Sequence, residues 1–274
     1  AGDEITTGSF NVALGKSALS TEDEHGRNVA IGYAALETQD AGADAYNVAV
    51  GFSAGNAITT GIKNTLIGGD AGIAMTSAIQ NVAVGYGALS VNIDGDNNTA
   101  VGYKALEDFE ADTDGHGYNT AIGASAMLNV TTGTENTAIG ALAIGTGVTT
   151  GNSNIAVGYA AGYNLTSGNS NVFVGRSSGV SVLTGVQNVA LGYNSMGTAN
   201  GSESKNVAVG FNALAVMDSD GDNFNTAVGY EAGLAVTTGT RNTLVGGSWC
   251  CVDNRYRQHV NWRCCWKSNN NRCK

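Results

Sequence analysis

The sequence contains no proline, has only 7% aromatic residues, and carries no cysteine or tryptophan before Trp249. Proline cannot donate a backbone hydrogen bond, so its absence suits a chain that pairs with neighbouring strands on both sides. The apolar residues are mostly alanine and valine, and glycine reaches 40. This composition predicts a thin core in which backbones approach closely. No run approaches about 18 consecutive apolar residues, so we expect no membrane-spanning segment.

Basic residues are also scarce. Residues 1–247 contain 7 Lys and Arg against 22 Asp and Glu, because residues 248–274 hold six of the 13 bases and one of the 23 acids. The resulting net charge of −15 for residues 1–247 disfavours binding to nucleic acid or to an anionic membrane surface. We therefore expect no nucleic-acid partner and no membrane insertion.

One motif dominates what is present. The pattern N-[VTI]-A-[VIL]-G-[YF]-x-A-[LGM] recurs in fourteen copies, and its positions are numbered here from the asparagine. The thirteen spacings between copies are 17 residues eight times, 18 twice, 19 twice and 21 once. The motif asparagines are Asn11, Asn28, Asn47, Asn64, Asn81, Asn98, Asn119, Asn136, Asn154, Asn171, Asn188, Asn206, Asn225 and Asn242.

A period of 17 residues is too short for two packed helices. Within it, β-branched residues alternate with small ones and are bounded by turn-forming "TTGxxN" segments, which predicts short strands joined by tight turns. Strands that recur at this period predict a β-solenoid, in which equivalent residues of successive coils stack one strand spacing apart. We expect an all-β fold of about fourteen 17-residue coils (a β-roll) over residues 1–247.

Stacking gives the two invariant residues structural roles. Asparagine at position one can form a ladder of amide hydrogen bonds with the copies above and below, and it tolerates a left-handed backbone. Glycine at position five permits a bend or a backbone contact that a Cβ atom would block. The predicted ladder includes Asn47, Asn64, Asn81, Asn98, Asn136, Asn154, Asn171 and Asn188.

The units "NVAIGYAAL", "NVAVGYGAL" and "NTAVGYKAL" resemble the head repeats of trimeric autotransporter adhesins. The longer unit with "TTGxxNTAIG" is similar to arrays in phage tail-fibre proteins, and the resemblance covers residues 5–247. It implies a left-handed β-roll of three identical chains, located outside the cell on a bacterial surface or virion fibre. It also implies partners among cell-surface glycans or proteins. The period is longer than that of the usual head repeat, so trimerisation and the mode of attachment are expectations from the resemblance.

Residues 248–274 differ sharply from the rest. Their cysteines, with His259, would be the ligands of a zinc site, but adjacent Cys-Cys pairs match the usual C-x₂₋₄-C spacing poorly. Reading the codons one nucleotide later turns every Trp into Gly and allows the repeat to return where its next copy is due. We interpret residues 248–274 as an out-of-frame tail, disordered or poorly packed. Because the chain also opens within the pattern, we expect an array that is truncated at both ends. The cysteines are Cys250, Cys251, Cys264, Cys265 and Cys273.

Enzyme motifs are weak. Ser53 and Ser177 lie in G-x-S-x-G matches, but both occupy motif position seven, where other copies carry Ala, Lys or Asn. A nucleophile elbow also needs a strand-to-helix turn with a partnering His and acid. His25 and His116 each stand alone in polar inserts, where we expect solvated side chains. The sequence indicates no enzyme.

Position six is aromatic in eight copies. If the coils stack in register, these rings form one stripe, either an internal or inter-chain ladder or a surface platform for sugar rings. Six copies interrupt the stripe with Lys16, Gly69, Ala124, Ala141, Arg176 and Gly247. Its members are Tyr33, Phe52, Tyr86, Tyr103, Tyr159, Tyr193, Phe211 and Tyr230.

Three acidic inserts, "NIDGDN" (92–97), "DTDGHG" (112–117) and "DSDGDN" (218–223), each precede a motif asparagine. They resemble the first half of a calcium loop, but the bidentate Glu of a full loop is missing. They are either solvated turns or weak calcium sites, and no cofactor is required. The calcium ligands would be Asp94, Asp96, Asp112, Asp114, Asp218, Asp220 and Asp222.

Together these patterns predict a structural and adhesive segment of an extracellular fibre, either a bacterial surface adhesin or a phage tail fibre. Many copies of a weak contact surface would give avidity through multivalency. The alternative is a self-contained β-solenoid that binds glycan. Ice binding by the "TTG" threonines is a weaker alternative, because these pairs lie at turns and are missing from several coils.

Overall fold

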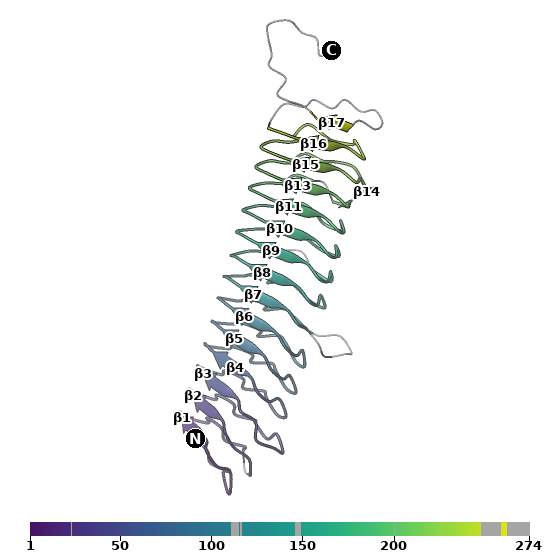
Figure 1. Cartoon of the computed structure of the whole chain (residues 1–274). Helices are drawn as coiled ribbons and strands as arrows, with labels where there is room; N and C mark the ends of the chain where they lie inside the picture. The colour runs from purple at the N-terminus through teal and green to yellow at the C-terminus, as the bar shows by residue number, and fades with distance from the viewer. Residues whose placement is uncertain are drawn as a thin grey trace, which may run out of the picture. The chain divides into compact units, whose positions relative to one another are not determined.

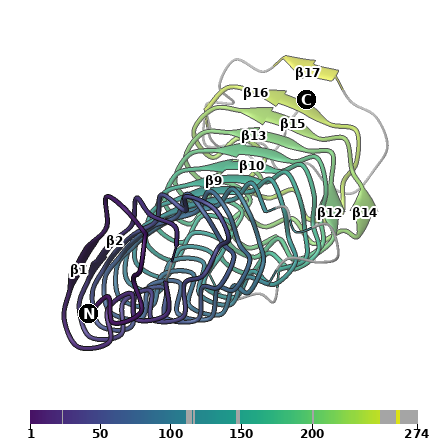
Figure 2. The same ribbon diagram turned by 90° about the horizontal axis from the view of Figure 1, so that it is seen from below.

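The structure, a computed structural model, describes residues 1–22, 24–110, 115, 117–145, 149–199 and 201–247, and the backbone of 259–261. The chain divides into two compact units, residues 1–150 and 151–274. Each unit is a parallel β-solenoid, as the repeat predicted, and no helix occurs among the described residues (Figure 1). In Figure 2 the strands that follow the motif asparagines lie along one side of the coils of each unit.

Every motif copy forms a three-residue strand that begins directly after the asparagine. Successive strands of a unit pair in parallel and in register, with valine or threonine beside the equivalent residue of the next coil. The first unit contains β1 (Val12–Leu14), β2 (Val29–Ile31), β3 (Val48–Val50), β4 (Thr65–Ile67), β5 (Val82–Val84), β6 (Thr99–Val101), β7 (Thr120–Ile122) and β8 (Thr137–Ile139).

The second unit has the same construction. Its motif strands are β9 (Ile155–Val157), β10 (Val172–Val174), β11 (Val189–Leu191), β13 (Val207–Val209), β15 (Thr226–Val228) and β16 (Thr243–Val245). A short second sheet pairs β12 (Glu203–Ser204) with β14 (Gly221–Asp222) in parallel. β17 (His259–Asn261) pairs with β16.

The strands show which of the two alternating residue sets faces inward. The middle residue, at position three, is buried, while positions two and four face outward. Alanine fills most of these inward sites, and Ala30, Ala83 and Ala208 are fully buried. Positions eight and nine add Ala and Leu or Met to the same core, as Ala105 and Leu106 do. The core is therefore thin and made largely of small side chains, as the composition predicted.

The glycine at position five lies where successive coils touch. At Gly85 φ is +134°, and an added Cβ would lie 2.3 Å from the carbonyl oxygen of Gly102. The same crowding recurs along both units: an added Cβ at Gly175 would lie 2.4 Å from the carbonyl oxygen of Gly192. No L side chain fits this position, because both the backbone conformation and the space exclude it. The predicted close backbone contact is confirmed.

The residue that adopts the left-handed backbone conformation at the coil corner is not the predicted asparagine. The motif asparagine does not adopt it; the preceding residue does, with φ of 63° at Phe10, 66° at Arg27 and 54° at Tyr46. This turns the chain so that the asparagine side chain points inward, and the motif asparagines are buried or nearly so. The corner therefore depends on the asparagine side chain, with the backbone strain carried by its neighbour.

Candidate functional site

The motif asparagines form the predicted ladder, by a mixed set of hydrogen bonds. The Oδ1 atom of Asn64 accepts the backbone N–H of Asn81 at 2.9 Å, and that of Asn81 accepts the N–H of Asn98 at 2.9 Å. The Nδ2 atom donates to a backbone carbonyl later in the same coil, as from Asn64 to Ala78 at 2.8 Å. Direct amide-to-amide bonds also occur, for example between Asn171 and Asn154 at 3.0 Å. These bonds satisfy buried backbone groups, so the ladder is structural.

The position-six aromatic residues lie on the surface. All eight are exposed, between 38% at Phe211 and 59% at Phe52. Neighbouring rings stack nearly in parallel, with centroids 5.2 Å apart for Tyr33–Phe52 and 6.0 Å for Tyr86–Tyr103. This spacing is somewhat larger than the strand spacing of about 4.8 Å, and stacked rings at this distance attract one another. The interpretation of the row as an internal ladder within one chain is therefore wrong.

In the second unit the row is longer than the sequence indicated. Tyr193, Phe211 and Tyr230 form a continuous stack with centroid distances of 5.2 and 5.1 Å. The guanidinium of Arg176 lies 5.6 Å from the ring of Tyr159 and 5.8 Å from that of Tyr193. A flat cation between two ring faces continues the stack instead of interrupting it. In the first unit Lys16 lies over Tyr33 at 6.0 Å.

A second exposed aromatic row precedes the motif asparagine. Phe10, Tyr46, Tyr118 and Phe224 occupy this place and are 45–78% exposed. The guanidinium of Arg27 lies between two of these rings, 5.1 Å from Phe10 and 5.5 Å from Tyr46. Sequence reasoning missed this row. Reading the residue before each asparagine as a column would have found it, because aromatic and cationic residues recur there.

Both aromatic rows border the outward face of the strands. Side chains alternate along a strand, so the residue before the asparagine, positions two and four, and position six all emerge on one side. Positions two and four carry mostly Val, Thr, Ile and Leu, and several are well exposed, among them Leu14, Ile67, Ile155 and Val245. Each unit thus presents an outward apolar face, which we call the strand face, with the position-six aromatic row along one edge and scattered aromatic and cationic residues along the other.

Charged groups at the rim of the strand face are locally paired. The side-chain hydrogen bond between Arg27 and Asp44 raises the pKa of the guanidinium and lowers the pKa of the carboxyl group. A hydrogen bond to Asp70 raises the pKa of the Tyr86 hydroxyl. Lys104 pairs with Glu107 at 2.9 Å, which raises the pKa of the lysine. At neutral pH, Arg27, Asp44 and Lys104 therefore stay charged, and the Tyr86 hydroxyl stays neutral.

The acidic inserts do not assemble the predicted calcium ligands in the described part of the chain. Asp96 accepts the backbone N–H of Ile79 at 2.7 Å, and Asp94 is exposed. Asp220 accepts the hydroxyl of Ser202 at 2.7 Å, Asp222 pairs with Lys205, and Asp218 is exposed. Among the described residues, these inserts bring no three acidic or histidine ligands close enough to share an ion. Asp112, Asp114 and His116 lie outside the described residues.

The serines of the G-x-S-x-G matches have backbone roles. Ser53 and Ser177 lie in coil turns with φ of 52° and 56°, and the backbone N–H of each donates to the preceding coil. Thr59 donates its hydroxyl to the carbonyl of Thr76 at 3.3 Å, so this threonine of a "TTG" pair bonds within the fold. These residues carry no catalytic arrangement in the structure.

The tail is described only at β17. Its backbone pairs with β16 in parallel, Thr243 beside His259 and Val245 beside Asn261, close to where the repeat predicts its next strand. The predictions for residues 248–258 and 262–274, including all five cysteines, lie outside the described residues.

No protein-family model matches the chain, and neither curated proteins nor solved structures give a significant match. In the part of the chain that the structure describes, no helix is long and apolar enough to cross a membrane. The inference of function therefore rests on the strand face and on the repeat.

Proposed function

We propose that this chain is a structural and adhesive segment of an extracellular fibre, a bacterial surface adhesin or a phage tail fibre. The observation that carries the proposal is the strand face, an apolar surface that recurs coil after coil and is bordered by the position-six aromatic row. Large exposed apolar surfaces are rare on proteins that act as monomers, and they mark interaction sites. A homotrimer would cover part of this surface by packing strand faces together, and the resemblance of the repeat to trimeric adhesin heads supports this state.

The mechanism is geometric. Parallel in-register strands place one copy of each surface residue in every coil, so a weak contact is repeated along the fibre. Repeated contacts bind a surface with an avidity far above the affinity of one contact. Receptors would be cell-surface glycans or proteins, met by residues that the trimer leaves uncovered. The acidic inserts would lie among these contact residues.

The second candidate is a self-contained binding module for glycan. The exposed stack of Tyr193, Phe211 and Tyr230 favours it, because sugar rings pack against aromatic faces. The two candidates differ in what covers the strand face. In the fibre a second copy of the chain covers it, whereas in the module the face and its rings stay free for ligand.

Sedimentation of the full chain under reducing conditions, with and without calcium, tests the proposal. We expect a trimer. Val50 and Val84 are half-buried residues of the strand face, and replacing both with glutamate should shift the chain toward monomer. The control replaces Thr60 and Thr132, which are exposed in turns of the same unit, with glutamate and should stay trimeric. A wild-type monomer at every concentration would contradict the fibre proposal. Loss of glycan binding in that monomer on Phe211→Ala would then establish the module.

A further inference from the structure

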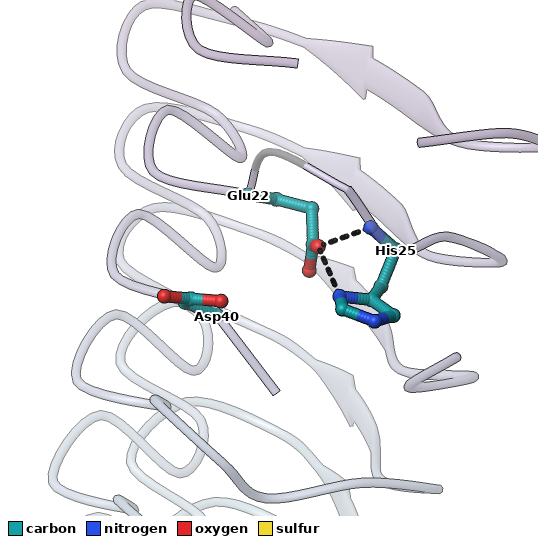
Figure 3. Close-up of side chains that lie close together, drawn as sticks. All are labelled: Glu22, His25 and Asp40. Atoms are coloured by element: carbon teal, nitrogen blue, oxygen red, sulfur yellow. Dashed lines mark hydrogen bonds and ion pairs between the residues drawn. The ribbon is translucent and has the colours of Figure 1, made fainter. Parts of the chain in front are cut away.

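A cluster near the start of the first unit brings together three metal-ligating side chains (Figure 3). Glu22 and His25 lie between β1 and β2, and Asp40 lies one coil further on, between β2 and β3. One ligand atom from each of the three lies within 4.8 Å of the others. Among the described residues this is the one group of three acidic or histidine side chains with this spacing.

Glu22 occupies a place where a carboxylate is costly. It is position twelve of its coil, and its side chain is fully buried. In nine other coils the equivalent residue is an apolar core residue. The described apolar equivalents, all buried, are Ile58, Met75, Phe109, Val130, Leu165, Val182, Ala199, Met217 and Val236.

The two other polar residues in this column are neutral amides whose side-chain nitrogen and oxygen both form hydrogen bonds. Gln39 donates to the carbonyl of Thr59 at 2.9 Å and accepts from Asn47 at 2.5 Å. Asn92 both donates to and accepts from the backbone of Gly95. Glu22 is therefore the one carboxylate among the described residues of this core column, and burial of a carboxylate requires compensating positive charge or hydrogen bonds.

His25 stands against this carboxylate. Its backbone N–H donates to Oε1 of Glu22 at 3.0 Å, and its Nδ1 atom lies 3.9 Å from the same oxygen. Nδ1 is itself buried and has no hydrogen-bond partner. The His25 side chain, predicted to be a solvated loop residue, is 29% exposed, with its Nδ1 atom on the buried side. A buried, unpartnered imidazole nitrogen beside a buried carboxylate is an arrangement that a metal ion satisfies directly.

We propose that Glu22, His25 and Asp40 bind a first-row divalent transition-metal ion, with Zn²⁺ as the reference ion. An imidazole nitrogen with two carboxylates suits zinc, whereas calcium requires six or more oxygen ligands. A tetrahedral zinc ion holds its ligand atoms roughly 3.4 Å apart, given bonds of about 2.1 Å. Asp40 is exposed, so a small rotation of its side chain closes the set. The ion would bind two successive coils together, and this role does not depend on the proposed function.

The test is zinc titration of the full chain by calorimetry, in a background with all five tail cysteines changed to serine so that no thiol competes. We expect one Zn²⁺ site per chain and a rise in the midpoint of thermal unfolding on zinc addition. Glu22→Leu places in the column the residue that Leu165 provides in another coil. It should weaken zinc binding at least about tenfold, abolish the zinc-induced rise, and unfold at a higher temperature than the parent without metal.

The matched control is Glu24→Gln, because Glu24 is exposed and lies beside the cluster without belonging to it. It should bind zinc as the parent does. His25→Ala and Asp40→Asn give two further variants in case Glu22→Leu does not fold, and each should also weaken zinc binding. Zinc binding that is equal in the parent and in all three cluster variants would overturn the proposal, as would binding of calcium in preference to zinc.

Discussion

The two residues that occur in every copy of the repeat, asparagine and glycine, act on the backbone. The asparagine oxygen accepts the backbone N–H of the next asparagine, as between Asn81 and Asn98 at 2.9 Å, inside a corner that water does not reach. An unpaired backbone group there would cost free energy. The glycine lets two coils approach to a distance that a Cβ atom would prevent. The repeat thus depends on interactions that are local to each junction between coils.

Two glycine substitutions test what the absence of a side chain at position five contributes through crowding and backbone conformation together. Gly85→Ala places a Cβ atom 2.3 Å from the carbonyl oxygen of Gly102, whereas Gly42→Ala, also at positive φ, meets nothing within 4 Å. We expect Gly85→Ala to lower the free energy of unfolding by more than about 3 kcal/mol and Gly42→Ala by about 1 kcal/mol. Urea unfolding followed by circular dichroism measures both. Equal losses would mean that the close contact carries no stability.

At the scale of a coil, a large core residue at one motif position is compensated by a small residue at a position that packs against it. Position three is Ala in most copies, but it is Phe173 in β10, and position nine is then glycine both in the preceding coil, Gly162, and in the same coil, Gly179. A Cβ atom on Gly179 would lie 2.4 Å from the ring of Phe173. Leu66 has the same relation to Gly55, at 2.7 Å, and to Gly72. A large residue at position three is thus matched by glycine at position nine of the same and the preceding coil, so that the volume of the core stays nearly constant.

This compensation predicts that Phe173→Ala destabilises the fold and that a second substitution partly restores its stability. Phe173→Ala should lower the free energy of unfolding by about 3–5 kcal/mol, because it opens a cavity in a core that cannot collapse. Phe224→Ala, at an exposed ring of the same unit, should cost under about 1 kcal/mol. Adding Gly179→Leu to Phe173→Ala restores the Ala–Leu pair found in other coils and should recover about 1 kcal/mol or more. Chemical denaturation of the four proteins measures this, and a double variant weaker than Phe173→Ala would contradict the compensation.

The fold was predictable at this scale because its determinants are local and repeated. Motif spacing, strand chemistry and invariant glycine each indicate the same coil, and all fourteen copies form the expected strand. The candidate sites were harder to predict from the sequence. Asp96 reads as a calcium ligand in the sequence, yet its carboxylate binds the backbone of Ile79 in the adjacent coil. Glutamate occupies position twelve only at Glu22, and the spacing of the repeat alone does not reveal that position twelve faces the core.

At the scale of the whole molecule, the main feature is an excess of negative charge that the few basic residues do not neutralise. Seven bases cannot neutralise 22 acids in residues 1–247. Repulsion among like charges destabilises a compact chain, and salt screens it over about 10 Å at 0.1 M. The ion pairs Arg27–Asp44 and Lys205–Asp222 are exposed, so each contributes little against this repulsion.

Salt should therefore stabilise the full chain at neutral pH. Raising sodium chloride from 20 to 300 mM at pH 7 should raise the midpoint of thermal unfolding, by about 2–4 °C for each kcal/mol of repulsion that is screened. The same comparison at pH 4 is the control, since many Asp and Glu side chains have ordinary pKa values of about 3.9–4.3 and are protonated there. The rise at pH 4 should be clearly smaller, because fewer negative charges remain to be screened. An equal rise at both pH values would point to a general salt effect on apolar burial, and a fall at pH 7 would show that attractive ion pairs outweigh the repulsion.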